Sequence, residues 1–432
     1  MNKEIKQRIE QLNNGKIPKG YQKTDFGVFP SDWVTDKKLI DIGTFGKGKG
    51  IPGNKMQSGG VPCVGYGDIY MKYSHFHFEE AQSFVDEETA KDSQLIKKGT
   101  LLFTGTGETA EEIGKCVCYN GDSTIYAGGD IITFVPQDVN PLFLAYQQYQ
   151  NFSLKKKASF GQGHSVVHIQ KESLEKLNVA YPESKNEQSR IVEILMKWDK
   201  AIELYDKQID ALTRYKAVCL RKMFPAKEQN VPEWRFRGFT GDWEQRKLGD
   251  ISDSYSGGTP SAGKIEYYGG TIPFIRSAEI NSDFTELFLT EEGLMNSSAK
   301  MINKGDILYA LYGATSGEVG LARLDGAINQ AILDIKPHVN YDANYLVQWL
   351  RKSKDSITRT YLQGGQGNLS GTIVASLMVD CPTFDEQKKI GAFFAYFDHL
   401  ITLHQRKKEV ITNQRKTLQQ YLLNGIVRIK HE

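Results

Sequence analysis

Residues 187–224 decide the fold of this chain, and they read EQSRIVEILMKWDKAIELYDKQIDALTRYKAVCLRKMF. Apolar side chains recur there at alternating steps of four and three residues, which is the seam of a coiled-coil helix. No glycine or proline interrupts the stretch, and Pro225 follows it as a helix stop. Such a helix must bury its stripe against a partner. The seam positions expected to pack against that partner are Ile191, Leu195, Trp198, Ile202, Ile209 and Leu212.

The expected partner helix lies near the end of the chain. Residues 199 positions apart correspond to each other: Glu187-Gln188 matches Glu386-Gln387, and most apolar seam positions match apolar residues. Lys216 and its match Arg415 interrupt both copies at the same place, and we expect this shared cation to mark a solvent-exposed or partner-facing turn. The matching packing positions are Ile390, Phe394, Phe397, Ile401, Ile411 and Leu418.

The segments between the helices repeat as well. Residues 98–103 match residues 304–309, and Gly161-Gln162-Gly163 matches Gly365-Gln366-Gly367, in the same order along the chain. The chain is therefore a tandem repeat with a period near 200 residues. The framework positions agree while the loops differ, as in two binding modules with different targets. We expect an N-terminal helix at 1–15, globular domains at 16–184 and 226–384, and long helices at 185–225 and 385–425.

A smaller similarity links the two ends of the chain. Leu12-Asn13-Asn14-Gly15 resembles Leu422-Leu423-Asn424-Gly425. Asn-Gly is ordinary chemistry for the end of a helix, so the similarity can be a coincidence between two caps. The alternative is that the N-terminal piece repeats the end of the long helix and closes a cyclic arrangement. The sequence leaves both interpretations open.

Composition restricts the class of protein. The chain has 432 residues, of which 40% are apolar and 25% charged, which is ordinary for a soluble protein of two or more domains. Its 54 basic and 52 acidic residues leave a net charge of +2, so any surface for nucleic acid must be local. No apolar run approaches the ~20 residues that span a membrane. The start of the chain does not resemble a signal peptide, and its five cysteines have no disulfide spacing, so we expect a cytoplasmic protein.

Motifs for catalysis and metal binding are missing. No P-loop, dinucleotide fingerprint, nucleophile elbow or Asn/Asp-Pro-Pro-aromatic methyltransferase motif occurs. His75 and His77, with Cys116 and Cys118, lack metal-site spacing, and alternation within a strand explains both pairs. The sequence therefore predicts a chain that catalyses nothing and holds no metal.

Nucleic-acid signals occur at matching places in the two halves. Lys155, Lys156 and Lys157 precede a Gly/Gln loop, and the cluster Arg351, Lys352, Lys354 and Arg359 precedes another. Cations hold phosphates, glycines admit close backbone approach, and Gln or Asn can pair with adenine edges. A solvated helix face is the alternative for a basic run, and plain turns are the alternative for the loops. The candidate DNA-binding residues are Lys47, Lys49, Thr104, Thr106, Lys155, Lys156, Lys157, Gln162 and His164 in the first half, and Thr259, Arg276, Tyr312, Thr315, Ser316, Arg359, Gln363, Gln366 and Asn368 in the second.

This order of parts resembles a known family. Gly257-Gly258-Thr259-Pro260-Ser261, Leu311-Tyr312-Gly313-Ala314-Thr315-Ser316-Gly317 and Gly364-Gly365-Gln366-Gly367-Asn368-Leu369-Ser370 are similar to strings of type I restriction-modification specificity subunits. The resemblance implies an α+β fold with an internal pseudo-twofold repeat. Two target recognition domains of mixed α/β type are then separated by two long antiparallel coiled-coil helices. The first half has Gly-Lys-Gly-Lys-Gly-Ile-Pro-Gly at residues 46–53 instead of Gly-Gly-Thr-Pro-Ser, which makes its contact residues harder to place.

The resemblance also implies a role and partners. Each globular half reads one half of a split target in double-stranded DNA, and the helices set the spacing and dock two modification subunits. Those methyltransferase subunits use S-adenosylmethionine, and restriction subunits use ATP and Mg²⁺ for translocation and cleavage, so the specificity subunit itself needs no cofactor. The alternative is a coiled-coil scaffold with two protein-interaction modules, which would show no salt-dependent binding to DNA.

Overall fold

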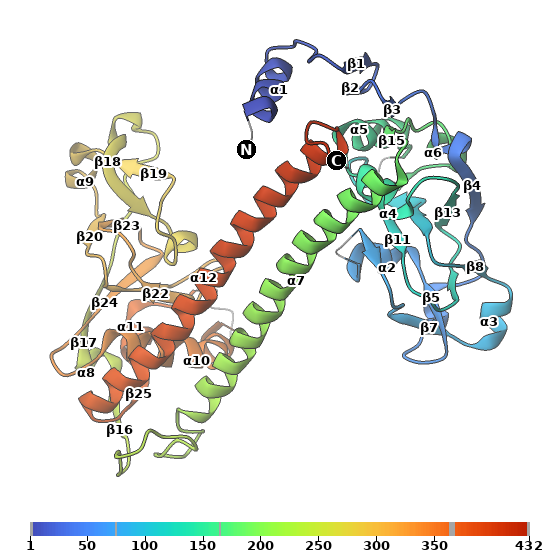
Figure 1. The fold of residues 1–432 in the computed structure, drawn as a ribbon. Helices are drawn as coiled ribbons and strands as arrows, with labels where there is room; N and C mark the ends of the chain where they lie inside the picture. The colour runs from blue at the N-terminus through green and yellow to red at the C-terminus, as the bar shows by residue number, and fades with distance from the viewer. Residues whose placement is uncertain (1–2, 74–75, 164–165, 363–367, 430–432) are drawn as a thin grey trace. The chain divides into compact units, whose positions relative to one another are not determined.

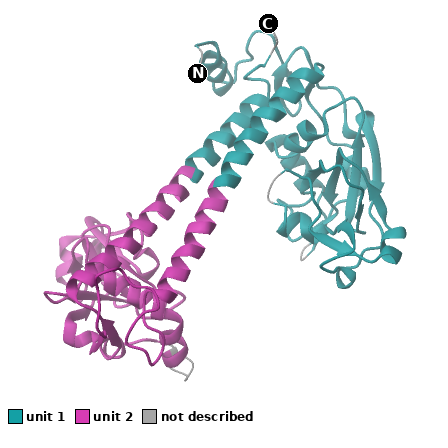
Figure 2. Cartoon of the chain, turned by 60° about the horizontal axis from the view of Figure 1, so that its bottom comes forward, with its two compact units in different colours: residues 1–204, 408–432 teal, residues 205–407 magenta. Residues whose placement is uncertain are grey.

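The computed structural model describes residues 3–73, 76–163, 166–362 and 368–429. The chain forms two compact units (Figure 2). Unit 1 contains residues 1–204 and 408–432, and unit 2 contains residues 205–407. The long helices α7 (Lys185–Lys222) and α12 (Phe384–Leu423) each contribute one part to unit 1 and one part to unit 2. Among the described residues, no helix is both long and apolar enough to cross a membrane.

Unit 1 contains a five-stranded sheet in the order β4-β13-β9-β11-β6 and a four-stranded sheet in the order β7-β5-β12-β8 (Figure 1). Both sheets mix antiparallel pairs with one parallel pair. The elements of this unit besides the long helices are α1 (Lys3–Asn13), β1 (Tyr21–Thr24), β2 (Gly27–Pro30), β3 (Trp33–Val34), η1 (Leu39–Ile42), β4 (Gly43–Lys47), η2 (Gly53–Lys55), β5 (Val61–Val64), α2 (Tyr66–Met71), β6 (His77–Phe78), β7 (Ser83–Val85), α3 (Glu87–Lys91), β8 (Gln94–Ile96), β9 (Thr100–Thr104), β10 (Thr106–Gly107), β11 (Cys116–Tyr119), β12 (Ile125–Ala127), β13 (Ile131–Pro136), α4 (Pro141–Gln147), α5 (Asn151–Phe160), β14 (Val167–His168), α6 (Lys171–Leu174) and β15 (Tyr181–Pro182).

Unit 2 repeats this plan with two four-stranded sheets, β17-β24-β21-β22 and β19-β18-β23-β20. Apart from β6, which has no counterpart among the described strands of unit 2, the strand orders match, so the internal repeat expected from the sequence is a repeat of topology. The elements of this unit besides the long helices are β16 (Glu244–Lys247), α8 (Leu248–Ile251), β17 (Ser252–Ser256), η3 (Ile265–Tyr267), β18 (Tyr268–Ile275), η4 (Ser277–Glu279), β19 (Leu287–Leu289), α9 (Glu291–Met295), β20 (Lys300–Ile302), β21 (Ile307–Ala310), β22 (Val319–Leu321), β23 (Gly326–Ile328), β24 (Ile332–Pro337), α10 (Ala343–Leu362), α11 (Gly371–Ala375) and β25 (Met378–Cys381).

The long helices pack antiparallel inside each unit. In unit 1, Asp199 of α7 pairs with Arg415 of α12. In unit 2, Lys216 pairs with Asp398, and the rings of Tyr205 and His404 lie 5.8 Å apart, so numbers rise along one helix as they fall along the other. The residue numbers of both ion pairs add up to 614, which gives the register of the pair.

The seam residues divide into two groups. Ile191 and Leu195 belong to the core of unit 1, and Ile390 and Phe394 to the core of unit 2, so the start of each long helix anchors a globular half. Phe397 is also buried. The other seam positions are half-buried, because one partner helix covers only one side of a helix. They are Trp198, Ile202, Ile209, Leu212, Ile401, Ile411 and Leu418.

The expectation that Lys216 and Arg415 mark an exposed turn is wrong. The Arg415 side chain is 6% exposed, and its Nε donates to Asp199 Oδ1 at 2.8 Å. The Lys216 side chain is 12% exposed, and its Nζ donates to Asp398 Oδ1 at 2.5 Å. Asp199 and Asp398 occupy matching positions of the repeat, so both cations interrupt the apolar seam in order to neutralise a carboxylate across the helix pair.

The segment after α12 lies against the segment before β3 inside unit 1. Arg428 donates to Glu187 at 2.7 Å and to Asp32 at 2.7 Å, and Tyr21 donates its hydroxyl proton to the Gly425 carbonyl at 2.6 Å. In unit 2 a matching buried ion pair joins Arg235 to Glu386, near the start of α12, at 2.8 Å. The continuous chain of unit 2 thus corresponds to two separate segments in unit 1. These contacts involve none of residues 12–15, so both interpretations of their similarity to residues 422–425 stay open.

Candidate functional site

Three loops that the sequence singled out meet in unit 1. The pairing of β10 with β14 sets Thr106 opposite His168, and Ile169 donates its backbone N–H to the Gly105 carbonyl at 2.9 Å. Gly105 in turn donates to the Asp130 carbonyl at 2.8 Å, and Gly48 donates to the Ile131 carbonyl at 2.7 Å. Loops around residues 48, 105 and 168 therefore share one framework, centred on the turn between β12 and β13.

Unit 2 builds the same meeting point. A bridge sets Tyr312 opposite Asn368, and Leu369 donates to the Leu311 carbonyl at 2.9 Å. Leu311 donates to the Ala331 carbonyl at 2.8 Å, in the turn between β23 and β24. Gly258 donates to the Ile328 carbonyl at 3.2 Å. The bonds of Leu369 and Leu311 match those of Ile169 and Gly105 in unit 1. The bond of Gly258 matches that of Lys49, whose N–H donates to the Ala127 carbonyl at 3.1 Å, although the side chains differ.

Matching glycines bring one loop of each unit against this turn. A Cβ at Gly48 would lie 1.7 Å from the Gly128 carbonyl oxygen, and a Cβ at Gly257 would lie 1.9 Å from the Ile328 carbonyl oxygen. No side chain fits at such distances, because the opposing atom is backbone and cannot move aside. The Gly-rich stretches of the two halves differ in sequence, but in both units a glycine lets the backbone of this stretch pack against the backbone of the turn.

Some candidate DNA-binding residues lie at or beside these meeting points, others lie on α5 and α10, and most of them reach solvent. Those that are exposed or half-exposed are Lys47, Lys49, Thr106, Lys155, Lys156 and Gln162 in unit 1, and Thr259, Tyr312, Thr315, Ser316, Arg359 and Asn368 in unit 2. His164, Gln363 and Gln366 lie outside the described residues. Whether these side chains contact DNA stays a prediction.

Two candidates are buried, so their predicted contact with DNA is wrong. Lys157 is 1% exposed and donates to the Gly114 carbonyl at 2.8 Å, and burial lowers the pKa of its ammonium group to about 8. Thr104 is fully buried in β9, where its hydroxyl lies 2.8 Å from that of Tyr70. Lys157 lies on the buried face of α5, whereas Lys155 and Lys156 lie on its solvent face. A run of three lysines in the sequence does not reveal this difference.

The basic cluster of unit 2 is also less available than the sequence suggested. Arg351 pairs with Asp398 at 2.7 Å, Lys354 pairs with Glu318, and Lys352 donates to the Pro225 carbonyl at 3.0 Å. Only Arg359 of the four remains exposed. The predicted recurrence of a free basic helix end in both halves is therefore wrong for unit 2.

Arg276 is likewise held by its own unit. Its guanidinium pairs with Glu279 at 2.8 Å and with Glu286 at 2.6 Å, and these hydrogen bonds raise its pKa. Because two carboxylates already neutralise its charge, Arg276 is a poor candidate for a phosphate contact.

Sequence reasoning missed two residues at the meeting points. His168 lies opposite Thr106, with its Nδ1 3.4 Å from the Thr106 hydroxyl. Gln330 was not considered, and it accepts a hydrogen bond from Thr259. Both become visible only when distant strands pair, so no local sequence signal marks them.

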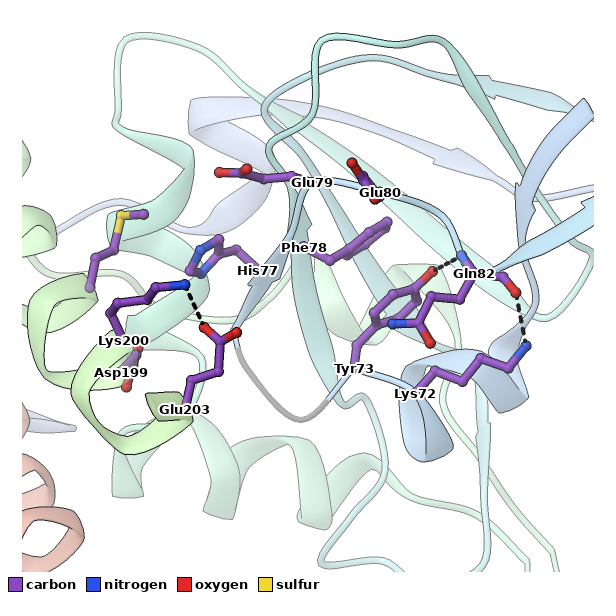
Figure 3. A pocket seen from close by; sticks show the side chains of 11 residues that line it. Lys72, Tyr73, His77, Phe78, Glu79, Glu80, Gln82, Asp199, Lys200 and Glu203 are labelled. Atoms are coloured by element: carbon purple, nitrogen blue, oxygen red, sulfur yellow. Dashed lines mark hydrogen bonds and ion pairs between the residues drawn. The ribbon is translucent and has the colours of Figure 1, made fainter. Parts of the chain in front are cut away.

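A separate pocket of about 420 Å³ lies in unit 1 between α7 and the region around β6 (Figure 3). Its charged side chains are largely engaged with one another or with neighbours: Lys200 pairs with Glu203 at 3.2 Å, and Lys72 pairs with Asp68 at 2.8 Å. Four carboxylates, Glu79, Glu80, Asp199 and Glu203, line it, so this pocket is unsuited to phosphates. Within the described ranges, no three His, Cys, Asp or Glu side chains gather as metal ligands would.

Comparisons with known proteins extend these observations. Residues 30–214 and 240–413 match the family model of the type I restriction modification DNA specificity domain. A putative type I restriction enzyme MjaX specificity subunit of Methanocaldococcus jannaschii is 24% identical over 429 residues, which cover 95% of this chain and 97% of the relative. The EcoR124I/EcoR124II specificity subunit of Escherichia coli is 25% identical over 276 residues, 61% of this chain and 65% of the relative.

The fold has a counterpart among solved structures. The S subunit of a type I restriction-modification system from M. genitalium aligns with a TM-score of 0.62 at 14% identity, covering 90% of this chain and 96% of that one. At this level of identity the likeness concerns the fold alone.

Proposed function

The chain belongs to the type I restriction modification DNA specificity family, and from this premise we propose that it is the subunit that selects the DNA target of a type I restriction-modification enzyme. Unit 1 reads one half of a bipartite target and unit 2 reads the other. The observation that carries this proposal is the meeting point of three loops, built twice on the same backbone hydrogen bonds. Different side chains stand at its matching positions, with Thr106 and His168 in unit 1 and Tyr312 and Asn368 in unit 2.

The chain supplies recognition, and its partners supply the chemistry. The two modification subunits methylate adenine with S-adenosylmethionine, and restriction subunits use ATP and Mg²⁺. The long helices set the distance between the half-sites and give each modification subunit a similar docking surface, because α7 and α12 are two copies of one helix. Rigid linkage also makes the second half-site nearly intramolecular once the first has bound.

An exchange of one globular half tests this division. Replacing residues 17–182 with the corresponding half of another family member should change one half-site of the target and leave the other half-site and the gap unchanged. The measurement is mapping of methylated adenines in cells that express the chimaera with its modification subunit. A simultaneous change in both half-sites would contradict independent reading by the two units.

The lysines of α5 provide a second test. Lys155→Ala with Lys156→Ala should weaken binding to all DNA sequences about equally and reduce the slope of log affinity against log salt by about 1.8, since each lost phosphate contact contributes about 0.9. The measurement is a salt titration of duplex binding by the complex with its modification subunits.

Lys157→Met is the matched control for this test. It removes the third charge of the same run from a position that is 1% exposed, so the salt slope should stay at the wild-type value. An equal loss of slope in the control, or an unchanged slope in the double variant, would exclude α5 as a phosphate-binding element.

A further inference from the structure

We propose that Gln330 reads a base in the half-site of unit 2 and that Thr259 positions it. This inference rests on the proposed function and names a specificity-determining residue for it. Gln330 is exposed in the turn between β23 and β24, the turn around which the three loops of unit 2 meet. The carbonyl of its neighbour Ala331 accepts a hydrogen bond from the backbone N–H of Leu311, which joins the turn to the residue before the strand bridge of Tyr312 with Asn368.

The turn that carries Gln330 is held from both sides. The Asn329 side chain accepts the backbone N–H of Ala331 at 3.1 Å, and Ile332 donates to the Asn329 carbonyl at 3.2 Å. These bonds make the backbone of Gln330 a fixed point rather than a freely moving loop tip. A reading residue needs this, since its discrimination depends on the geometry of the amide against a base edge.

The Gln330 side chain is oriented as well. The Thr259 hydroxyl donates to Gln330 Oε1. Thr259 is itself constrained, because Gly257 and Gly258 pack against Ile328 and Ser298 without room for a Cβ, and the next residue, Pro260, accepts a hydrogen bond from Tyr268 at 2.8 Å. An exposed glutamine normally samples many rotamers, whereas this one has its oxygen engaged by a rigid neighbour.

This orientation determines which bases the amide suits. With Oε1 turned toward Thr259, Gln330 presents the two N–H donors of Nε2. In the major groove these donors match guanine O6 and N7 or thymine O4, whereas the N4 amino group of cytosine offers only a donor. The geometry therefore points to a base that presents acceptors at the position read by Gln330.

Unit 1 differs at the matching position. An offset of 201 residues, fixed by the correspondence of β13 with β24, places Gly129 where unit 2 has Gln330. Unit 1 thus offers no side chain there, and Lys49 approaches the same turn through its backbone N–H to the Ala127 carbonyl at 3.1 Å. The two units thus share a backbone framework but differ in the side chain at this position. Such a difference allows the two units to recognise different half-sites.

Gln330→Glu is the decisive variant. It keeps the shape of the side chain and the bond from Thr259 but replaces the N–H donors with an acceptor oxygen. One base position in the half-site of unit 2 should change from guanine or thymine to cytosine or adenine. The preference at that position should shift by roughly 5- to 150-fold, the usual range for one good base contact. Thr259→Val should relax discrimination at the same position without a change of base, because the amide is released.

The experiment uses the full complex with its modification subunits. Methylation mapping gives the wild-type target, and the half-site that survives the exchange of residues 17–182 belongs to unit 2. Binding is then measured to duplexes that carry each alternative base pair at each position of that half-site. Gln229→Glu, an exposed glutamine elsewhere in unit 2, adds the same charge as a control and should leave all preferences unchanged.

The outcomes separate this inference from the proposed function. A single switched position in Gln330→Glu supports the inference. Unchanged base preferences in both Gln330→Glu and Thr259→Val, with sequence-specific binding intact, would overturn it and leave the proposed function standing. A wild-type complex that binds all duplexes equally would overturn the proposed function, and this inference with it.

Discussion

Arg415→Met is expected to lower the free energy of unfolding of unit 1 by about 3–5 kcal/mol, the usual cost of leaving a buried carboxylate without its cation. Asp199 is 6% exposed, and besides Arg415 it is bound by the Tyr146 hydroxyl, which donates to its carboxylate at 2.6 Å and brings no charge. The variant also removes the guanidinium from the face of Phe76, 4.4 Å from the ring centroid. Hydrogen exchange of the backbone amides of unit 1 under native conditions measures the loss.

Lys216→Met is the matched control, since it removes the cation at the same position of the repeat. Asp398 keeps Arg351 at 2.7 Å and the Gln348 amide at 3.0 Å, so the expected loss in unit 2 is only about 1 kcal/mol. Burial opposes the charge of Asp398, yet Arg351 and Lys216 lower the pKa of its carboxyl group. A loss in Lys216→Met as large as in Arg415→Met would show that the pairs are equivalent and that Arg351 contributes nothing.

Deletion of one heptad from both long helices should abolish methylation of the original target and create a target with a shorter gap. The residue numbers of both ion pairs add up to 614, and residues 203–209 correspond to residues 405–411 by the same sum, so removing both segments leaves the residues of each ion pair matched. Seven residues correspond to about 10 Å of helix, the length of about three base pairs. Methylation mapping should therefore find unchanged half-sites separated by a gap shortened by at most about three base pairs.

Duplication of the same two heptads is the opposite control and should lengthen the gap. Deleting only residues 203–209 should instead disrupt the helix pair, because Lys216 would lose its register with Asp398. Altered half-sites together with the original gap would mean that the helices do not measure the distance between the two readers.

The sequence predicted the parts of the fold that repeat. The heptad seam, the offset of 199 between Ile191 and Ile390, and the matched strings around Gly161 and Gly365 were enough for the order of elements, while the antiparallel direction of the helix pair came from the resemblance to specificity subunits. These features are local or follow from comparing the chain with itself. Helix pairing then followed from the need to bury an apolar stripe.

The candidate site was harder to predict, because contacts between distant segments decide it. Lys157 looks like its two neighbours in the sequence, but its backbone position points it into the core. Arg276 and Arg351 look available until the carboxylates that meet them from other elements are known. Gln330 has no local signal, since its significance depends on Thr259, which lies 71 residues away along the chain. Charge and residue type thus identify candidate DNA-binding residues, and only the contacts between distant segments show which of them are free to bind.

The division of unit 1 between two distant parts of the chain has a consequence for biosynthesis. The ion pair between Glu187 and Arg428 joins residues 241 positions apart, and residues 205–407 of unit 2 are translated in between. At 5–20 residues per second the ribosome needs roughly 12–50 s for this distance. Unit 2 is contiguous, so its translation is complete before that of unit 1. Ile191 and Leu195 are translated early, but they can pack against Leu422 and Leu423 only when the end of the chain has been made. The first reader is therefore translated first, yet it gains its contacts with Leu422, Leu423 and Arg428 only after unit 2 has been translated.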